Sequence, residues 1–275
     1  MFESCQILNV RVHRVTLAAV CAQMEAFIRS GRPHQIVTVN MDFIRLARED
    51  PAFCAAVNGA DLVVPDGVPV LWAARLLRRP LGERVTGVDL VEQGAALAAA
   101  RGYRVFLLGA APGVADAAAA ALIRRYPGLC IAGTYAPPIG PFSAEENARM
   151  VAAVRAARPH LLFVAFGAPR QELWIRAHLD ELEVPVCVGV GGTFNFLSGA
   201  IPRAPVWMRR AGLEWAHRLA QEPGRLWRRY LVHDLPVFLR LVGAGLMPLP
   251  GVQRWLLGAP AALAGTADHP LATTG

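Results

Sequence analysis

The sequence contains no lysine, so all 28 of its basic side chains are arginines. Together with the many alanines, this suggests a bias towards GC-rich codons, and the abundance of arginine alone therefore says little about function. Cysteine is scarce as well, with five residues and no Cys-x-x-Cys pair. An odd number of scattered cysteines argues against a disulfide framework or a paired-cysteine zinc site, and favours reduced thiols in a cytoplasmic protein.

Long apolar segments are also lacking. The chain begins Met-Phe-Glu, without a basic region followed by an apolar stretch, and therefore predicts no signal peptide. No run without a charged residue is longer than 184–202, and this run contains four glycines and two prolines, which argues against a membrane-spanning helix. With 54% apolar and 18% charged residues, the chain can still form a sizeable core. We expect a soluble, folded protein.

Several signatures of catalysis are missing. There is no Asp-x-Asp motif to hold a divalent metal against a diphosphate, no Walker lysine and no Gly-x-Ser-x-Gly elbow. The seven histidines form no pair with metal-ligand spacing. We therefore expect neither a metal nor a cofactor. A diphosphate bound by this chain would have to be neutralised by arginines and helix N-termini.

Residues 1–202 alternate between two patterns. Short runs that are apolar throughout predict buried strands, and alanine-rich segments with helical spacing separate them. This alternation is typical of a mainly parallel sheet with helices on both faces, so we predict a Rossmann-like α/β core. The expected strands are residues 34–39, 60–64, 103–109, 160–167 and 184–192, and the clearest helices are 16–30 and 113–126.

The pattern changes after residue 202, where arginine, tryptophan and leucine are mixed. Residues 201–240 contain eight arginines against three acidic residues, which gives this segment most of the net charge of +7. We predict a basic amphipathic helical appendage over 203–257 and a disordered tail over 258–275. The interleaved Trp215, Trp227 and Tyr230 favour docking on an anionic membrane surface, and a basic face exposed only to solvent is the alternative.

In an open parallel sheet, ligands bind where the strands end at their carboxyl edge. The sharpest candidate there is Asp66, which closes an apolar strand and precedes Gly67. It is either part of an Asp-Gly turn or, in an apolar pocket, a general base whose proton affinity is raised by burial. The other polar side chains in the loops after the predicted strands are Asn40, Asp42, Gln171, Glu172 and Asn195.

Two of these loops have competing interpretations. After Pro169, Gln171 and Glu172 stand side by side where a strand leads into a helix. The helix dipole explains an acidic residue in the first turn but not the amide beside it, so a binding site is the alternative. Residues 189–199, GVGGTFNFLSG, resemble a phosphate-binding glycine loop, although Phe194 replaces the last glycine of the dinucleotide fingerprint.

Seven stretches, taken in order, resemble the WecG/TagA/CpsF family of bacterial glycosyltransferases over about residues 7–240. The resemblance implies transfer of a hexose or N-acetylhexosamine from a UDP-sugar to a polyprenyl-diphosphate-linked saccharide, with inversion and without a metal. It implies a peripheral enzyme at the cytoplasmic face of the bacterial membrane that serves cell-surface polysaccharide or exopolysaccharide synthesis. The stretches are TVN, VVPDGVPV, RVTGVDL, FLLGAAPGV, AFGAPRQELWI, GVGGTFNFLSGAIPRAPVW and GLEWAHRLAQEPGRLWRRY.

The resemblance also implies roles for particular residues. The family's proposed catalytic base falls on Asp66. Its uracil-contacting position falls on Asn195, where the family commonly has aspartate, and asparagine offers uracil a different hydrogen-bonding pattern. Substrate-binding positions fall on Thr38, Asn40, Arg84 and Gln171, to which we add Glu172, and we expect the nucleotide also at Gly167, Gly189, Gly191 and Gly192. Arginines expected at the leaving diphosphate or the membrane face are Arg203, Arg218, Arg225 and Arg228.

Two other classes of function stay open on the residues alone. A Rossmann-like pattern also suits a dinucleotide-dependent oxidoreductase, and the basic C-terminal segment suits a non-enzymatic module that binds membranes or nucleic acid. Of these partners we expect a membrane surface and no nucleic acid. The sequence does not distinguish N-acetylmannosamine, its uronic acid and glucose as the transferred sugar. It also leaves open the acceptor, the polymer and the formation of a homo-oligomer.

Overall fold

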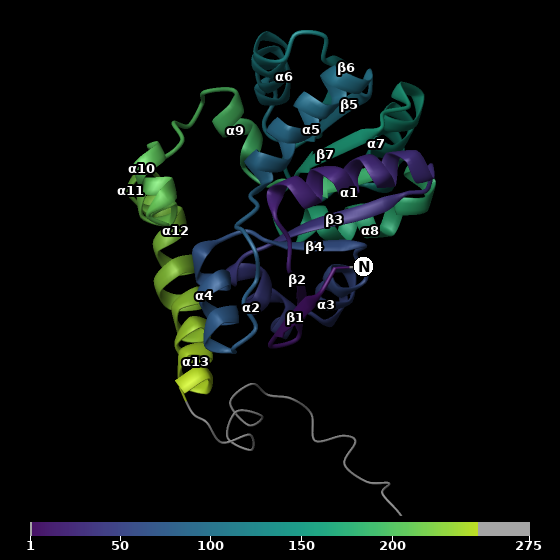
Figure 1. The fold of residues 1–275 in the computed structure, drawn as a ribbon. Coiled ribbons are helices and arrows are strands. Elements are labelled where there is room, and N and C mark those ends of the chain that lie inside the picture. Colours follow the sequence, from purple (N-terminus) through teal and green to yellow (C-terminus); the bar gives the residue numbers. More distant parts are fainter. Residues whose placement is uncertain (1, 247–275) are drawn as a thin grey trace, which may run out of the picture.

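The computed structural model describes residues 2–246, apart from the side chains of Arg210, Arg225, Arg229 and residues 244–246. Six parallel strands form one sheet in the order β4-β3-β8-β7-β5-β6 (Figure 1). The predicted tail, 258–275, and the end of the predicted appendage lie outside the described residues. The strands are β3 (His34–Val39), β4 (Leu62–Pro65), β5 (Arg104–Gly109), β6 (Cys130–Tyr135), β7 (Leu161–Ala165) and β8 (Val186–Gly189).

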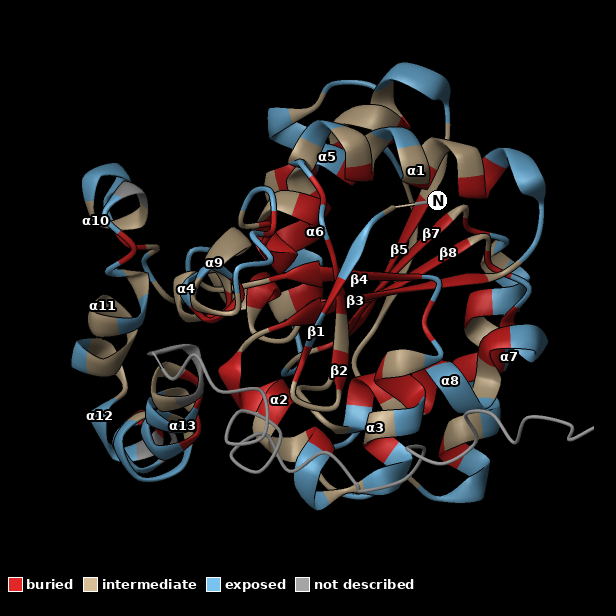
Figure 2. Ribbon diagram, turned by 60° about the horizontal axis from the view of Figure 1, so that its bottom comes forward, coloured by how far each residue is buried: buried red, intermediate tan, exposed pale blue. Residues whose placement is uncertain are grey.

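Helices cover both faces of the sheet, because successive side chains of a strand point into different apolar cores. Ile36 of β3 packs in a core with α1, α5 and α6, whereas its neighbour Val37 packs in a core with α2 and α3. The central strands are buried throughout (Figure 2). The predicted Rossmann-like α/β core is confirmed. The helices are α1 (Leu17–Ser30), α2 (Met41–Glu49), α3 (Pro51–Asn58), α5 (Gly87–Arg101), α6 (Val114–Arg125), α7 (Ala144–Ala157) and α8 (Arg170–Leu182).

Both predicted helices are confirmed within one residue at each end. Thr16 caps α1, where its side chain accepts a hydrogen bond from the backbone N–H of Ala19 at 3.2 Å. Gly31 ends the helix at φ 67°, in the left-handed region that favours glycine. Helix α6 begins after Gly113 and ends before Tyr126.

Three strands were not predicted. Strand β6 lies at the edge of the sheet and is only partly buried, so its sequence, CIAGTY, contains no continuous apolar run. Strands β1 (Ser4–Ile7) and β2 (Val10–His13) form an antiparallel hairpin, and burial alternates along β1. The hairpin contacts β4, where the backbone N–H of Val63 donates to His13 Nδ1 at 2.9 Å. Apolar runs predict strands that are buried on both faces. Strands β1 and β6 are not, and β2 has Arg11 and His13 between and after its two valines, so that it contains no apolar run.

Beyond residue 202 the described chain is largely helical and forms a C-terminal arm, residues 203–246, along one side of the core (Figure 1). Val237 and Leu241 are buried in the core that contains residues of α2 and α4. The N–H of Leu235 donates to Tyr230 five residues back, a π-helical turn that precedes a proline. No helix within 2–246 is long and apolar enough to cross a membrane. The remaining elements are α4 (Val68–Leu76), α9 (Thr193–Leu197), α10 (Val206–Arg210), α11 (Glu214–Gln221), α12 (Pro223–Trp227), η1 (Arg228–Asp234) and α13 (Leu235–Leu246).

Candidate active site

The ends of β4, β3 and β8 meet at the carboxyl edge of the sheet, because these strands are neighbours and parallel. The backbone N–H of Asp66 donates to Val39 at 2.7 Å, which fixes the end of β4 against the end of β3. Gly67 follows at φ 141°, and a Cβ at this position would lie 3.8 Å from the Cβ of Asn40. The structure therefore brings Asn40 and Asp66 together, as their positions after parallel strands predict.

Asp66 is partly exposed at this edge and has an unusual affinity for its proton. Desolvation by burial raises the pKa of Asp66 to about 6. The guanidinium groups of Arg218 and Arg84 oppose this rise. The carboxylates of Glu214 and Asp89 add to it. At neutral pH the Asp66 carboxyl is mostly ionised, yet it is a stronger base than an ordinary exposed aspartate.

Four charged side chains connect the core to the arm. Arg84 Nη1 donates to Glu214 at 3.0 Å, and Arg203 Nε donates to the same carboxylate at 3.4 Å. Arg203 Nη2 also donates to Asp89 at 3.2 Å. Asp89 belongs to the capping box of α5, so this end of the network is anchored in the core. Arg84 and Arg203 were predicted from the sequence, but their carboxylate partners were not, although Glu214 is one of few acidic residues in the basic segment.

Arg218, from α11 of the arm, reaches the glycine loop of the core. Its guanidinium carbon lies 4.8 Å from the ring centre of Phe196, and its Nη2 lies 3.5 Å from where a Cβ on Gly192 would stand. Its Nε is buried and has no hydrogen-bond partner among the described residues. Since Arg218 also lowers the pKa of Asp66, three distant parts of the chain meet here, namely the end of β4, the glycine loop and the arm.

The other two arm arginines proposed from the sequence are not brought into this cluster by any described contact. Arg228 is exposed, and its guanidinium carbon lies 5.4 Å from the ring centre of the adjacent Trp227. The side chain of Arg225 is outside the described part of the structure. Both remain predictions.

Gln171 ties two loops together. Its Oε1 accepts hydrogen bonds from the backbone N–H groups of Gly167 and Gly191, both at 3.0 Å, and its Nε2 donates to Glu172 at 2.6 Å. The side chain is only 2% exposed. An amide can accept and donate at once, which a carboxylate cannot do, and this explains why an uncharged residue stands beside Glu172. Contact with a substrate was expected from the sequence, whereas the polar atoms of Gln171 form hydrogen bonds inside the protein.

Glu172 is fully buried, and burial raises its pKa to about 8, against the hydrogen bond from Gln171. At neutral pH the group is mostly protonated, which differs from the ionised residue that the helix dipole would favour. Its Oε2 has no hydrogen-bond partner among the described residues, and nor does the buried Oε1 of Gln35. Gln35 Nε2 donates to the backbone oxygen of Glu172 at 3.2 Å, so the two residues adjoin.

Gly189 ends β8 next to the side chains of Gln171 and Glu172. A Cβ there would lie 2.5 Å from Glu172 Oε1 and 2.6 Å from Gln171 Nε2, so only glycine fits without moving them. Thr38, buried in β3, donates from Oγ1 to the Gly189 carbonyl at 3.4 Å. Thr38, Gln171 and Glu172 thus pack together with the glycine loop in one unit at the carboxyl edge of the sheet.

Asn195 lies in α9 beside Gly192. Its backbone N–H donates to the Gly192 carbonyl at 3.2 Å, and its Nδ2 lies 3.9 Å from the position of a Cβ on that glycine. Gly167 and Gly191 both have positive φ, of 80° and 54°, which allows their N–H groups to face Gln171. Within residues 2–246, no three His, Cys, Asp or Glu side chains are placed to hold a metal ion.

A model of the glycosyl transferase WecG/TagA/CpsF family matches residues 5–249 of the chain. The chain belongs to this family. Similar proteins include three from Staphylococcus aureus, of strains MW2, NCTC 8325 / PS 47 and MRSA252, each named N-acetylglucosaminyldiphosphoundecaprenol N-acetyl-beta-D-mannosaminyltransferase. Each is 30% identical over 235 residues, which cover 85% of this chain and 89% of the relative.

Membership of the WecG/TagA/CpsF family confirms the resemblance noted in the sequence and identifies the chain as a glycosyltransferase. The assignment as a glycosyltransferase supersedes the two other classes of function that the residues alone left open, the oxidoreductase and the non-enzymatic basic module. The positions matched include the whole described arm, so the arm belongs to the family's shared sequence. The roles of individual residues stay predictions.

Proposed function

We propose that this glycosyltransferase moves a hexose or N-acetylhexosamine from a UDP-sugar to a polyprenyl-diphosphate-linked saccharide, with Asp66 as general base. The observation that carries the proposal is the meeting of Asp66 with Arg84 and Arg218 at the carboxyl edge of the sheet. A base and two cations in one place suit a reaction that removes a proton and expels a phosphate leaving group. The names of the relatives favour N-acetylmannosamine as the sugar and N-acetylglucosamine on a lipid diphosphate as the acceptor.

The chemical step is a single displacement. Asp66 accepts the proton of an acceptor hydroxyl, and the oxygen attacks the anomeric carbon of the donor as the bond to the UDP oxygen breaks. UDP leaves with the bonding electron pair, and the configuration at the anomeric carbon inverts. The relatives' names give a β-linked product, which inversion would form from a donor with an α bond.

Arginines supply the positive charge for the leaving diphosphate in this proposal, so the transfer needs no metal. Arg218 lies over Gly192, and its buried Nε lacks a partner among the described residues, so its guanidinium is suited to donate hydrogen bonds to a phosphate oxygen there. Arg84 and Arg203 share the Glu214 carboxylate, with which a diphosphate would compete. Arg225 and Arg228 are assigned to the membrane-facing side of the same segment.

The nucleotide is assigned to the loops after β7 and β8, where Gly167, Gly191 and Gly192 allow close approach to the backbone. Gly189, also expected at the nucleotide from the sequence, is buried at the end of β8 against Gln171 and Glu172, and its assigned role is to support the loop that follows it. Asn195 is assigned to the uracil edge, and Thr38 and Asn40 to the sugar side of the site. Gln171 and Glu172 are assigned to position the two glycine loops relative to each other. This positioning role replaces the direct substrate contact expected from the sequence, because both side chains are buried.

Membrane association completes the proposal. Trp207, Trp215 and Trp227 of the arm are 64%, 41% and 44% exposed, and tryptophan settles at the interface of a bilayer. We assign the enzyme to the cytoplasmic face of the bacterial plasma membrane as a peripheral protein, in the synthesis of a cell-surface or exopolysaccharide polymer.

A donor panel tests the proposed reaction. UDP release would be measured on N-acetylglucosaminyl-diphosphoundecaprenol with UDP-N-acetylmannosamine, its uronic acid and UDP-glucose, each with and without EDTA. We expect turnover with one donor, unchanged by EDTA. Turnover that EDTA abolishes and added metal restores would contradict the metal-independent mechanism. Binding of UDP without turnover with any of the donors would contradict the acceptor assignment.

A further inference from the structure

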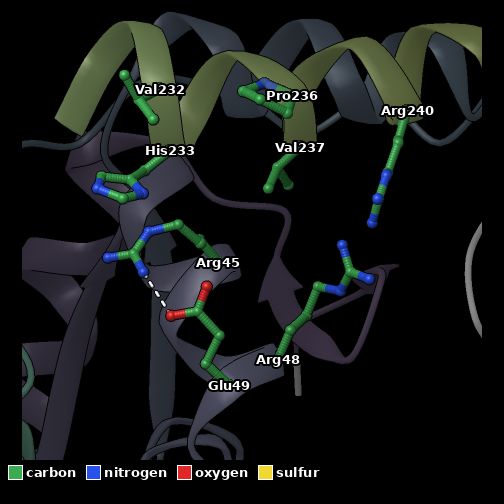
Figure 3. Close-up of a pocket in the computed structure, with 8 residues that line it drawn as sticks. All are labelled: Arg45, Arg48, Glu49, Val232, His233, Pro236, Val237 and Arg240. Carbon is green, nitrogen blue, oxygen red and sulfur yellow. Dashed lines mark hydrogen bonds and ion pairs between the residues drawn. The ribbon is translucent and has the colours of Figure 1, made fainter. Parts of the chain in front are cut away.

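A second basic site lies between the core and the arm, apart from the residues assigned to catalysis. It is a cavity of about 310 Å³ (Figure 3). One wall comes from α2 of the core, and the other comes from η1 and α13 of the arm. The lining residues are Arg45, Arg48, Glu49, Val232, His233, Pro236, Val237 and Arg240.

Two of the three arginines in this cavity have no anionic partner within the described part of the chain. Arg45 is occupied, since it donates to Asp42 at 2.7 Å and to Glu49 at 2.5 Å. Arg48 and Arg240 are exposed and form no hydrogen bond or ion pair with the described residues. Their guanidinium groups project from opposite walls toward each other (Figure 3).

Two facing guanidinium groups repel each other unless an anion lies between them. A phosphate group has the charge and the several acceptor oxygens to receive hydrogen bonds from both. Carboxylates already present gather around Arg45, on which Asp42, Glu49 and Asp234 all act electrostatically. The side of the cavity that is left for an outside anion is therefore the one between Arg48 and Arg240.

An exposed apolar row on the arm meets the cavity at Val232. Val232 lines the cavity and is 51% exposed, and Leu235 and Leu239 follow at helical spacing with 41% and 57% exposed. Leu231, at 51% exposed, extends the row. A ligand with a phosphate in the cavity could thus lay an alkyl chain along these side chains. Phosphate beside an apolar chain is the chemistry of a phospholipid.

We propose that the cavity between α2 and α13 binds the phosphate of an anionic phospholipid head group, held by Arg48 and Arg240. The inference rests on the membrane contact in the proposed function and gives that contact a specific site. The site shares no residue with the cluster around Asp66. Because Arg48 is on the core and Arg240 on the arm, a bound head group would also fasten the arm that carries Arg218.

Matched double variants of the full chain test this. R48Q/R240Q removes the two unpaired charges of the cavity, and R32Q/R124Q removes two exposed arginines elsewhere, so the net charge is the same in both. Binding is measured by flotation with phosphatidylcholine vesicles, with and without phosphatidylglycerol. We expect R48Q/R240Q to bind the phosphatidylglycerol vesicles about thirtyfold more weakly than wild type, and the control to stay within about threefold. Equal losses in the two variants would overturn the proposal, because general surface charge would then explain the binding.

A measurement with inorganic phosphate distinguishes a phospholipid head group from a free phosphate ion as the ligand of the cavity. If thermal stabilisation by phosphate at constant ionic strength is lost in R48Q/R240Q while vesicle binding is unchanged, the site takes a soluble phosphate and the lipid assignment is wrong. Transfer to a short-chain acceptor in detergent is measured in parallel. We expect R48Q/R240Q to have wild-type turnover in this assay, since neither arginine belongs to the proposed catalytic cluster. The lipid site and the proposed reaction are thereby tested separately.

Discussion

Replacement of Gly189 by alanine should disrupt the unit beneath the proposed active site. The added Cβ would lie 2.5 Å from Glu172 Oε1, 2.6 Å from Gln171 Nε2 and 3.0 Å from Gln171 Cδ, all below an ordinary van der Waals distance. The backbone cannot move away easily, because β8 is paired with β3 on one side and β7 on the other. The Gln171 amide must therefore shift.

Three hydrogen bonds depend on that amide, those to Gly167, Gly191 and Glu172. Each contributes about 1 kcal/mol net, and a buried group left without a partner costs roughly 1–3 kcal/mol. We therefore expect Gly189→Ala to lower the free energy of unfolding by about 2–4 kcal/mol. Because the two glycine loops lose their common support, we also expect weaker binding of UDP.

Urea unfolding followed by circular dichroism measures the first effect, and calorimetric titration with UDP measures the second. Gly224→Ala is the matched control, since nothing lies within 4 Å of the Cβ position and the residue is in α12. The control should be unchanged or more stable by up to about 1 kcal/mol. If Gly189→Ala unfolds within about 0.5 kcal/mol of wild type and binds UDP normally, the positioning role of Gln171 and Glu172 is wrong.

Two further predictions concern Glu172 and Arg218. Burial raises the pKa of Glu172 to about 8 from an ordinary 4.5. Between these two pH values the folded state keeps a proton that the unfolded state has lost. The free energy of unfolding should therefore fall as the pH rises through that interval. Urea midpoints between about pH 7 and 8 should therefore fall more steeply for wild type than for Glu172→Gln, and parallel slopes would show that the group is not protonated. Arg218→Ala should lower kcat by about a hundredfold, from lost charge at the leaving diphosphate, whereas Arg124→Ala should not, and equal kcat values would remove Arg218 from the mechanism.

The sequence predicts those parts of the fold whose pattern is local. Apolar runs predict β3, β4, β5, β7 and β8, because strands covered on both faces need apolar side chains at every position. Capping residues likewise predict both ends of α1. The edge strand β6 and the β1–β2 hairpin have mixed burial, so their sequences do not differ enough from those of loops.

The candidate site divides in the same way. Asp66 is recognisable because a lone carboxylate ends an apolar strand, and the parallel topology then places it beside Asn40. The role of Gln171 depends on Gly191, twenty positions away in another loop, and no local pattern contains that contact. The approach of Arg218 to Gly192 and the pairing of Arg84 with Glu214 depend on how the arm packs, which hydrophobic spacing alone does not fix.

The most direct test of the central claim is the rate of sugar transfer by Asp66→Asn, measured as UDP release on N-acetylglucosaminyl-diphosphoundecaprenol with the donor chosen by the panel. Asp180→Asn, an exposed aspartate of α8, is the control. We predict that kcat falls by roughly a thousandfold in Asp66→Asn with UDP binding unchanged, and that wild-type kcat/KM declines below about pH 6 as Asp66 takes up its proton. Transfer by Asp66→Asn at near the wild-type rate, with the same decline below pH 6, would contradict the assignment of Asp66 as the base.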